Sequence, residues 1–200
     1  MNKKIDRTLR LTLFAIITVL LFSCNPLLNF GVVQKGMFYR SGQPDKDDFK
    51  YITRKLKIKT LVIFKKGVES FERKLASQYG IGLYHLSMSA STPPTNEELD
   101  HFFSVVTTRE NHPVWIHCEG GSDRTGIMTA LYRIEFNNWN KLEAIIEMIS
   151  YFHIPFRYPK LIQYIFNYKR RYGSYRETDE EIEALKHYLE EKDLLEPTIQ

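Results

Sequence analysis

One stretch of ten residues, 117–126, constrains the fold of this chain more than any other part of its sequence. It reads HCEGGSDRTG. The apolar residues 114–116 lead into it and apolar residues at helical spacing follow it, a pattern that predicts a strand, a short loop and a helix. In that arrangement, backbone N–H groups converge above the loop and favour an anion there. Gly120 and Gly121 allow the loop to curl tightly. The sequence therefore predicts an anion-binding loop at a strand–helix junction.

Two side chains of this stretch carry the chemistry, Cys118 near its start and Arg124 near its end. Cysteine attacks as the thiolate, which a helix N-terminus and a ring of amides favour. Arginine presents a planar fork that binds phosphate through two hydrogen bonds. Together they predict phosphoryl transfer to sulfur. The alternative, a buried structural cysteine at a strand end, explains neither the glycines nor the Arg-Thr-Gly.

The stretch resembles the active-site signature of the cysteine-based protein tyrosine phosphatase superfamily, His-Cys-x-x-Gly-x-x-Arg-Thr-Gly. Its Asp just before the Arg resembles the bacterial and atypical dual-specificity variants. The signature positions are filled by His117, Cys118, Gly121, Arg124, Thr125 and Gly126. The resemblance implies a three-layer α/β fold, with a short, mostly parallel sheet flanked by helices and the catalytic loop between a strand and a helix. It also implies phosphomonoester hydrolysis through a cysteinyl-phosphate, with no metal or other cofactor.

The resemblance assigns a role to each position. Cys118 attacks phosphorus, His117 keeps the thiolate ionised and orders the loop, and Thr125 stabilises the thiolate when it leaves. The substrate-binding positions, whose amides and guanidinium hold the phosphate oxygens, are Glu119, Gly120, Gly121, Ser122 and Arg124. These donors match the charge that develops in the transition state.

The general acid is less clearly assigned. In the family, an aspartate on a separate loop protonates the leaving oxygen, but the corresponding residues here, 89–94, contain no carboxylate. Glu97, Glu98 and Asp100 follow at the start of a predicted helix, where acids favour the helix dipole. Asp123, inside the signature, is the candidate that we favour, and a loop-bracing carboxylate is the alternative.

Three hypotheses about function stay open, two of which differ in the substrate class. Relatives that prefer inositol phosphates often carry lysines within this loop, where the present chain has Glu119, Gly120, Ser122 and Asp123, and an acidic loop repels polyanions. This favours a singly phosphorylated protein target, such as phosphotyrosine. A phosphoinositide or inositol-phosphate substrate is the alternative, because bacterial inositol-phosphate hydrolases can carry Glu at the first position. The third is a catalytically silent phosphate-binding module, which the missing loop aspartate supports and the intact Cys118 and Arg124 oppose.

The N-terminus has the pattern of an export signal. Basic residues precede the uncharged, apolar residues 11–22, a run shorter than the roughly 20 residues of a membrane span. The run ends in Leu-Phe-Ser-Cys, which resembles a bacterial lipobox and implies cleavage before Cys24 and lipidation of that cysteine. We therefore expect an exported, membrane-anchored bacterial lipoprotein on the periplasmic or cell-surface side. An uncleaved anchor and a plain secretory signal are the alternatives.

The remaining sequence suggests one catalytic domain. The expected organisation is a signal peptide (1–23), a tether (24–34), the catalytic domain (35–175) and an acidic C-terminal helix that packs on the domain or extends it (176–200). Residues 39–44, Tyr-Arg-Ser-Gly-Gln-Pro, are similar to the start of the domain in small phosphatases. We expect residues 37–40 to form an edge strand and Pro44 to begin a helix.

Charge and cysteine content limit the other possibilities. A net charge of +4 without a basic, aromatic-interleaved stripe gives no indication of nucleic-acid binding. With only Cys24 and Cys118, no disulfide framework is possible beyond a pairing of those two.

Overall fold

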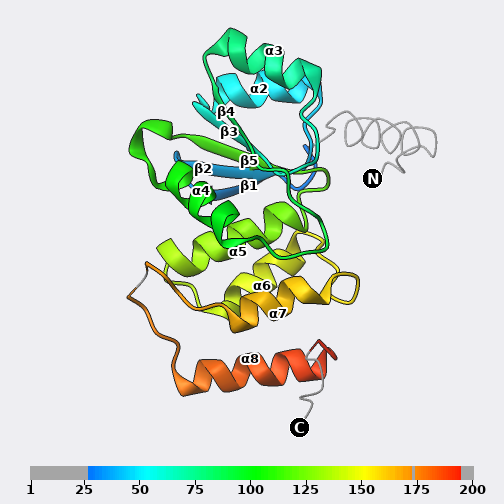
Figure 1. Cartoon of the computed structure of the whole chain (residues 1–200), viewed down its shortest axis with the longest axis vertical. Helices are drawn as coiled ribbons and strands as arrows, with labels where there is room; N and C mark the ends of the chain where they lie inside the picture. The colour runs from blue at the N-terminus through cyan, green and yellow to red at the C-terminus, as the bar shows by residue number, and fades with distance from the viewer. Residues whose placement is uncertain (1–26, 173, 195–200) are drawn as a thin grey trace, which may run out of the picture.

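A five-stranded sheet lies at the centre of the computed structural model, which describes residues 27–172 and 174–194 (Figure 1). The strands are β1 (Gly31–Gln34), β2 (Phe38–Ser41), β3 (Thr60–Ile63), β4 (Gly82–His85) and β5 (Val114–His117). Their order is β1-β2-β5-β3-β4; the last four are parallel, and β1 runs antiparallel to β2. The predicted α/β class with a mostly parallel sheet is confirmed.

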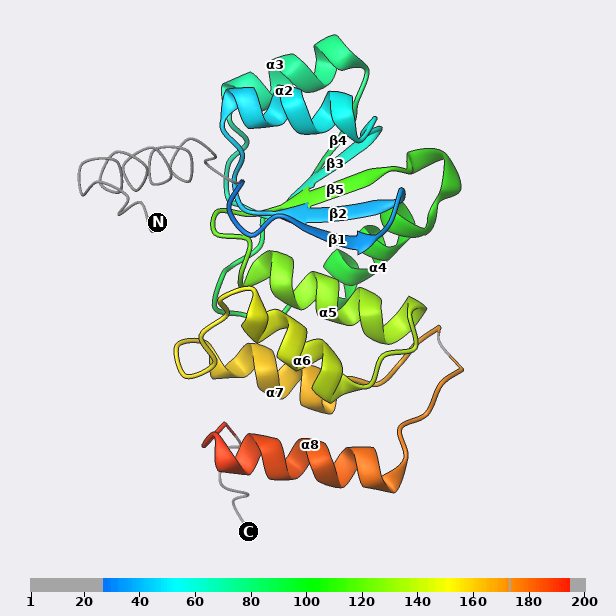
Figure 2. The ribbon, with the colours of Figure 1, turned by 180° about the vertical axis from the view of Figure 1, so that it is seen from behind.

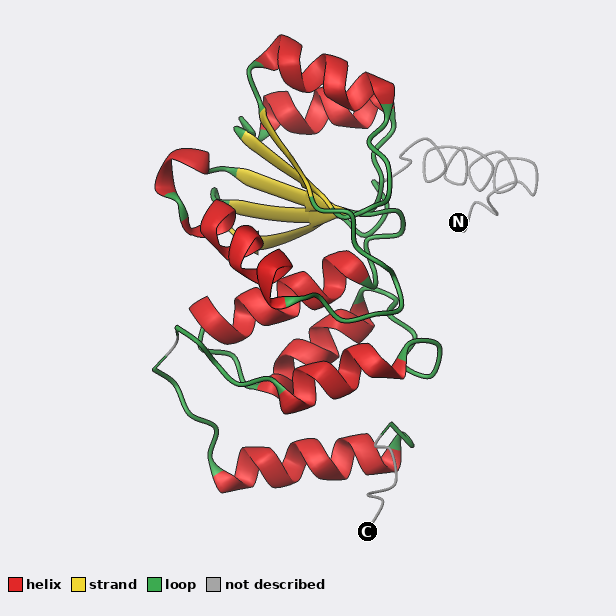
Figure 3. Cartoon of the chain, in the orientation of Figure 1, coloured by secondary structure: helices red, strands yellow, loops and turns green. Residues whose placement is uncertain are grey.

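Helices cover both faces of the sheet (Figure 3). One face carries α2 (Lys46–Lys55) and α3 (Ser70–Tyr79). The other carries α4 (Asn96–Thr107) and α5 (Arg124–Phe136), and the helices α6 (Lys141–Ser150), α7 (Pro159–Asn167) and α8 (Asp179–Glu191) pack beyond α5. The short 3₁₀ helix η1 (Arg109–Asn111) precedes β5. The helix α8 buries Leu185 and Leu189 in this second core and exposes its acidic residues.

The central strands are buried on both faces, as parallel strands between helices must be. Along β3 and β5, Leu61 and Trp115 pack against α2 and α3, whereas Val62 and Ile116 pack on the opposite core. Because the parallel strands are in register, their carboxyl ends meet at one edge of the sheet. The residues that follow β5 leave the sheet at that edge, where α/β folds bind ligands.

Two predictions near the N-terminus were wrong, the edge strand and the helix start at Pro44. Residues 31–34, which lie in the expected tether, form β1 and pair with β2, so β2 is not an edge strand. The two strands join through a tight turn in which Gly36 adopts a φ of 75°. Pro44 does not begin a helix: α2 starts at Lys46, because the Asp45 carboxylate accepts hydrogen bonds from the first-turn amides.

Local side-chain and backbone hydrogen bonds define other helix boundaries. Thr95 and Glu98 form the capping box of α4, and Thr178 and Glu181 form that of α8. Gly80 ends α3 in the left-handed conformation, with a φ of 65°. The predicted signal peptide and Cys24 lie outside the described residues. Within the described part of the chain, no helix is both long and apolar enough to cross a membrane.

Candidate active site

The signature loop, residues 118–123, joins β5 to α5 at the carboxyl edge of the sheet. Seen from behind, it lies where the strands converge, beside the first described residues and near the α6–α7 connection (Figure 2). Cys118 is only 2% exposed. The Gly121 N–H donates a hydrogen bond to its Sγ, with a distance of 3.2 Å between the nitrogen and sulfur atoms. The structure therefore contains the predicted contact between a loop amide and the thiol.

Three consecutive carbonyl oxygens of the loop accept hydrogen bonds from residues outside it. The donors and acceptors are Gln43 N with Glu119 O (2.8 Å), Asn29 Nδ2 with Gly120 O (2.7 Å) and Arg40 Nη2 with Gly121 O (2.5 Å). In a planar trans peptide, the N–H points away from the C=O. Because the carbonyls are tied to the surrounding chain, the N–H groups of residues 120–122 turn toward the inside of the loop. This arrangement forms an anion-binding nest.

Arg40 is a second arginine at the loop, besides the Arg124 of the signature. Its side chain is buried, and its guanidinium lies 3.8 Å from the centre of the Tyr151 ring. Burial lowers the pKa of Arg40 to about 10, against the opposing effects of Glu147, Tyr151 and Cys118. Arg40 therefore stays positively charged at neutral pH. A buried cation behind the loop favours both the thiolate and a bound phosphate.

His117 is held by a buried carboxylate that the sequence did not reveal. Its Nε2 lies 2.9 Å from Oε1 of Glu72, and both side chains are fully buried. Glu72 also accepts hydrogen bonds from Gln43 Nε2 and from the backbone N–H of Glu69, each at 2.9 Å. Burial alone would raise the pKa of Glu72, but the hydrogen bond and charge of His117, with these two donors, lower it below 4.5. His117 is thus fixed in orientation behind Cys118.

Arg124 and Thr125 begin α5 and carry buried polar atoms without hydrogen-bond partners among the described residues. The unpartnered atoms are the Nε of Arg124 and the hydroxyl oxygen of Thr125. Arg124 Nη1 donates a long hydrogen bond to the Phe64 carbonyl oxygen, at 3.4 Å. Buried polar groups are nearly always hydrogen-bonded in proteins. An oxyanion in the loop provides the acceptor that the guanidinium lacks.

Asp123 is the only carboxylate candidate for the general acid that lies in the loop itself. Its Oδ1 is 2.7 Å from Nδ1 of His153, whose side chain is fully buried and belongs to the α6–α7 connection. The Nε2 of His153 is buried and has no hydrogen-bond partner in the described structure. A bare acceptor nitrogen tolerates that position better than an unpaired N–H of an imidazolium. We therefore assign the neutral tautomer, in which Nδ1–H donates to Asp123.

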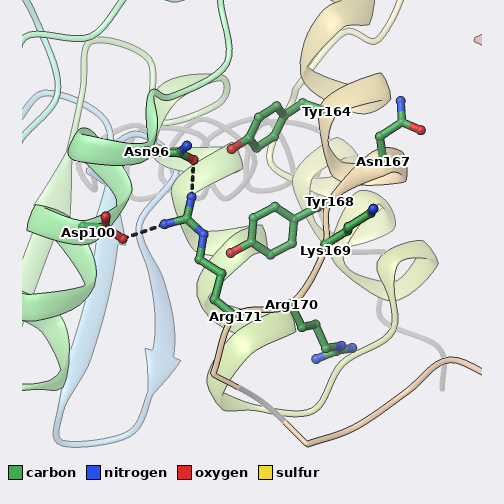
Figure 4. Close-up of a pocket in the computed structure, with 8 residues that line it drawn as sticks. All are labelled: Asn96, Asp100, Tyr164, Asn167, Tyr168, Lys169, Arg170 and Arg171. Atoms are coloured by element: carbon green, nitrogen blue, oxygen red, sulfur yellow. Dashed lines mark hydrogen bonds and ion pairs between the residues drawn. The ribbon is translucent and has the colours of Figure 1, made fainter.

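The carboxylates at the start of α4 have other partners. Glu98 accepts a hydrogen bond from the Thr95 backbone N–H at 2.7 Å, and Asp100 forms an ion pair with Arg171 at 2.5 Å. Arg171 also donates to Asn96, so it connects the segment after α7 to α4 (Figure 4). The pocket drawn there is lined by residues of α4, of α7 and of the segment after α7, and by no residue of the signature loop. Glu97 is exposed.

Comparison with known proteins supports this geometry. Residues 25–184 match the model of a family described as the tyrosine phosphatase family. The chain is similar to inositol diphosphatase DSP4 of Arabidopsis thaliana, with 30% identity over 113 residues, which cover 54% of this chain and 56% of that protein. It is also 30% identical to the dual specificity protein phosphatase TpbA of Pseudomonas aeruginosa, over 55% of this chain and 49% of TpbA. The chain thus spans about half the length of these relatives.

Solved structures show the same fold. The core catalytic domain of the phosphatase SIW14 from S. cerevisiae superposes with a TM-score of 0.61 and 23% identity, covering 86% of this chain and 96% of that one. The structure of P. aeruginosa TpbA gives a TM-score of 0.60 and 24% identity, with coverage of 80% and 91%. At this identity the likeness establishes the architecture of the domain.

Gly121 provides a test of the nest. It adopts a φ of 74°, and a Cβ there would lie 2.5 Å from the Gly42 backbone nitrogen. We expect Gly121→Ala to cost at least about 1–3 kcal/mol of stability from backbone strain and to abolish phosphate binding. Gly120→Ala is the matched control, because its nearest neighbour would be the Ser122 hydroxyl at 3.6 Å. Urea unfolding and phosphate titration measure both effects; equal behaviour of the two variants would contradict the proposed loop geometry.

Because the pKa of Glu72 is lowered in the folded protein, we expect the free energy of unfolding to depend on pH. A carboxylate whose folded pKa is lowered stabilises the fold fully above its unfolded value, and this stabilisation is lost as the pH falls through the folded pKa. We expect Glu72→Gln to lower the free energy of unfolding by about 1–3 kcal/mol at pH 7, because a buried hydrogen-bonded charge is removed. This difference should shrink on acidification below about pH 4, near the ordinary Glu value. The exposed Glu110→Gln serves as control in urea unfolding at each pH and should show no such difference.

Proposed function

Because the chain belongs to the tyrosine phosphatase family, we propose that it hydrolyses phosphomonoesters as a tyrosine- or dual-specificity-type phosphatase. The main support for this proposal is the geometry of the signature loop. Its carbonyl oxygens accept hydrogen bonds from residues outside the loop, so that the successive backbone N–H groups point toward Cys118. The Cys118 thiolate attacks phosphorus, the ester P–O bond breaks, and the leaving oxygen takes a proton. Water then attacks the cysteinyl-phosphate, which releases inorganic phosphate and restores the thiolate.

The loop residues divide the remaining work. Arg124 and the loop amides bind the equatorial phosphate oxygens, whose charge grows in the transition state. Arg40 supplies a fixed positive charge from behind the loop. His117, oriented by Glu72, stabilises the ionised Cys118. The Thr125 hydroxyl, buried and unpartnered in the described structure, is available to the thiolate that leaves in the second step.

Asp123 is the general acid in this proposal. The contact with His153 engages Oδ1, and the second carboxyl oxygen can carry the proton. The exposed Glu97 is the competing candidate, because Glu98 and Asp100 are engaged elsewhere.

A singly phosphorylated protein target, such as phosphotyrosine, is the substrate class that we favour, and an inositol phosphate is the alternative. TpbA is named a dual specificity protein phosphatase, and DSP4 an inositol diphosphatase. The two acidic side chains of the loop discriminate only weakly between phosphoprotein and inositol-phosphate substrates. Glu119 lies 3.5 Å from Lys65, and Asp123 contacts His153, so each acidic side chain has a basic neighbour.

Export and anchoring complete the proposal. The lipobox-like residues 21–24 support cleavage before Cys24, lipidation there and a periplasmic or cell-surface location. The match of the family model begins at residue 25, directly after that cysteine. The catalytic domain would then be held close to the membrane.

Hydrolysis tests the central proposal. The purified chain should release phosphate from an aryl phosphate in the presence of a metal chelator. Cys118→Ser should abolish turnover while phosphate still binds. Arg124→Lys should lose most activity, because an ammonium cannot reproduce the two-point geometry. A Cys118→Ser protein that retains most of the activity would exclude the cysteinyl-phosphate, and phosphate binding without any wild-type turnover would identify a silent binding module.

Asp123→Asn tests the general acid through the leaving group. With an aryl phosphate whose leaving group is stable as an anion, the rate should change little. With phosphotyrosine or an alkyl phosphate, it should fall by about 10²–10⁴-fold, the usual contribution of a positioned acid. Glu97→Gln is the matched comparison. An equal loss on both substrates would assign Asp123 a structural role, and leaving-group sensitivity confined to Glu97→Gln would assign the acid to α4.

Cys24→Ser tests anchoring. If Cys24 is lipidated, this variant should carry no acyl groups and keep its full leader, which mass spectrometry of the intact protein detects. The wild-type chain should begin at a modified Cys24. An unmodified Cys24 within an intact wild-type N-terminus would instead support an uncleaved anchor.

A further inference from the structure

Exposed apolar side chains are concentrated next to the signature loop. Five of the nine exposed large hydrophobic residues in the described chain belong to two short segments, 28–30 and 152–156. They are Phe156 (83% exposed), Phe152 (74%), Leu28 (56%), Ile154 (40%) and Phe30 (36%). Aromatic rings exposed to this degree are costly in water unless a second surface covers them. We call these five residues the apolar rim.

The two segments lie on either side of the loop and are tied to it. On one side, Asn29 donates hydrogen bonds to Gly120 O and Ser122 Oγ. On the other, His153 contacts Asp123. The two segments also lie close to each other. Gly31 follows the first segment and Tyr151 precedes the second, and the Tyr151 ring packs so closely on Gly31 that a Cβ there would have no space. Both views place the segments at the edge of the sheet where the loop lies (Figures 1 and 2).

The position of the chain's attachment indicates what covers the rim. Leu27, the first described residue, is three residues after Cys24, and an extended chain of that length reaches about 11 Å. With an uncleaved anchor, the apolar run ends at Phe22, and the reach is about 18 Å. On either form of anchoring, the membrane lies beside the rim. The exposed Arg157 and Lys160 flank Phe156 and suit anionic headgroups.

We propose that the apolar rim inserts shallowly into the lipid bilayer that anchors the chain, so that the signature loop faces the membrane surface. The inference rests on the proposed anchoring and phosphatase activity. Phenylalanine and leucine side chains beside basic residues are the composition of surfaces that bind membrane interfaces without spanning them. The loop then selects phosphomonoesters carried at the bilayer surface, such as a lipid headgroup, over those free in solution, and this placement favours a lipid substrate over the soluble phosphoprotein target.

Tryptophan fluorescence in vesicles tests the contact. The full chain is reconstituted into phosphatidylcholine–phosphatidylglycerol vesicles with or without brominated acyl chains, as the Phe156→Trp variant. Tyr51→Trp is the matched control, because Tyr51 is 57% exposed on α2, which covers the sheet face opposite α5 (Figure 1). The fluorescence of the unsubstituted chain, which contains two native tryptophans, is measured in the same vesicles and subtracted. Bromine should remove most of the fluorescence added by Phe156→Trp and little of that added by Tyr51→Trp; absent or equal quenching overturns the proposal.

Activity gives the second readout. The double variant Phe152→Ser/Phe156→Ser should hydrolyse a soluble aryl phosphate like the wild type. It should lose about tenfold or more on a lipid phosphomonoester within the vesicle, since two buried aromatic side chains are removed. If instead quenching is absent and the double variant loses activity on a soluble phosphotyrosine peptide, the rim binds protein and the proposal is wrong. Quenching without hydrolysis by any wild-type preparation would support the rim and reject the phosphatase function.

Discussion

The loop must present several backbone N–H groups to one point, and this requirement governs much of the structure around it. Peptide carbonyls opposite those N–H groups need partners outside the loop. The first described residues and β2 supply them, through Asn29, Arg40 and the Gln43 amide. This explains why an antiparallel hairpin precedes the parallel strands: it places the partners of the loop beside β5. The N-terminal segment is therefore part of the catalytic architecture.

Burial of charge behind the loop has an energetic cost that the surrounding core offsets. Arg40 is buried, with Nε and Nη1 unpaired among the described residues, and its pKa falls to about 10 because it is removed from water. Glu72 is buried too, but three donors lower its pKa. Removing ions from water is unfavourable even when they are partly paired. The loop is thus preorganised for an anion at the expense of local stability, as functional sites commonly are.

The sequence predicted the loop that contains Cys118 and Arg124 but not the side chains that support it. Cys118, Arg124 and their strand–helix context lie within ten residues, so local spacing was sufficient. Arg40 and Gly121 are separated by 81 positions, and no local pattern connects them. Glu72 occupies a capping-box position that usually faces water, and only the fold shows its burial. Residues 31–34 carried no independent strand signal, because β1 depends on its pairing with β2.

The proposed location of the general acid has a consequence for how substrate reaches the site. An acid on a separate loop acts when that loop closes over the substrate, whereas Asp123 lies in the same short loop as the nucleophile and is braced by buried His153. In the proposed mechanism, no closing segment is needed to complete the catalytic group. Access is then determined by the surfaces that border the loop permanently. Here these are the apolar rim and the point where the chain approaches its proposed anchor, so in this proposal attachment and substrate choice depend on the same edge of the sheet.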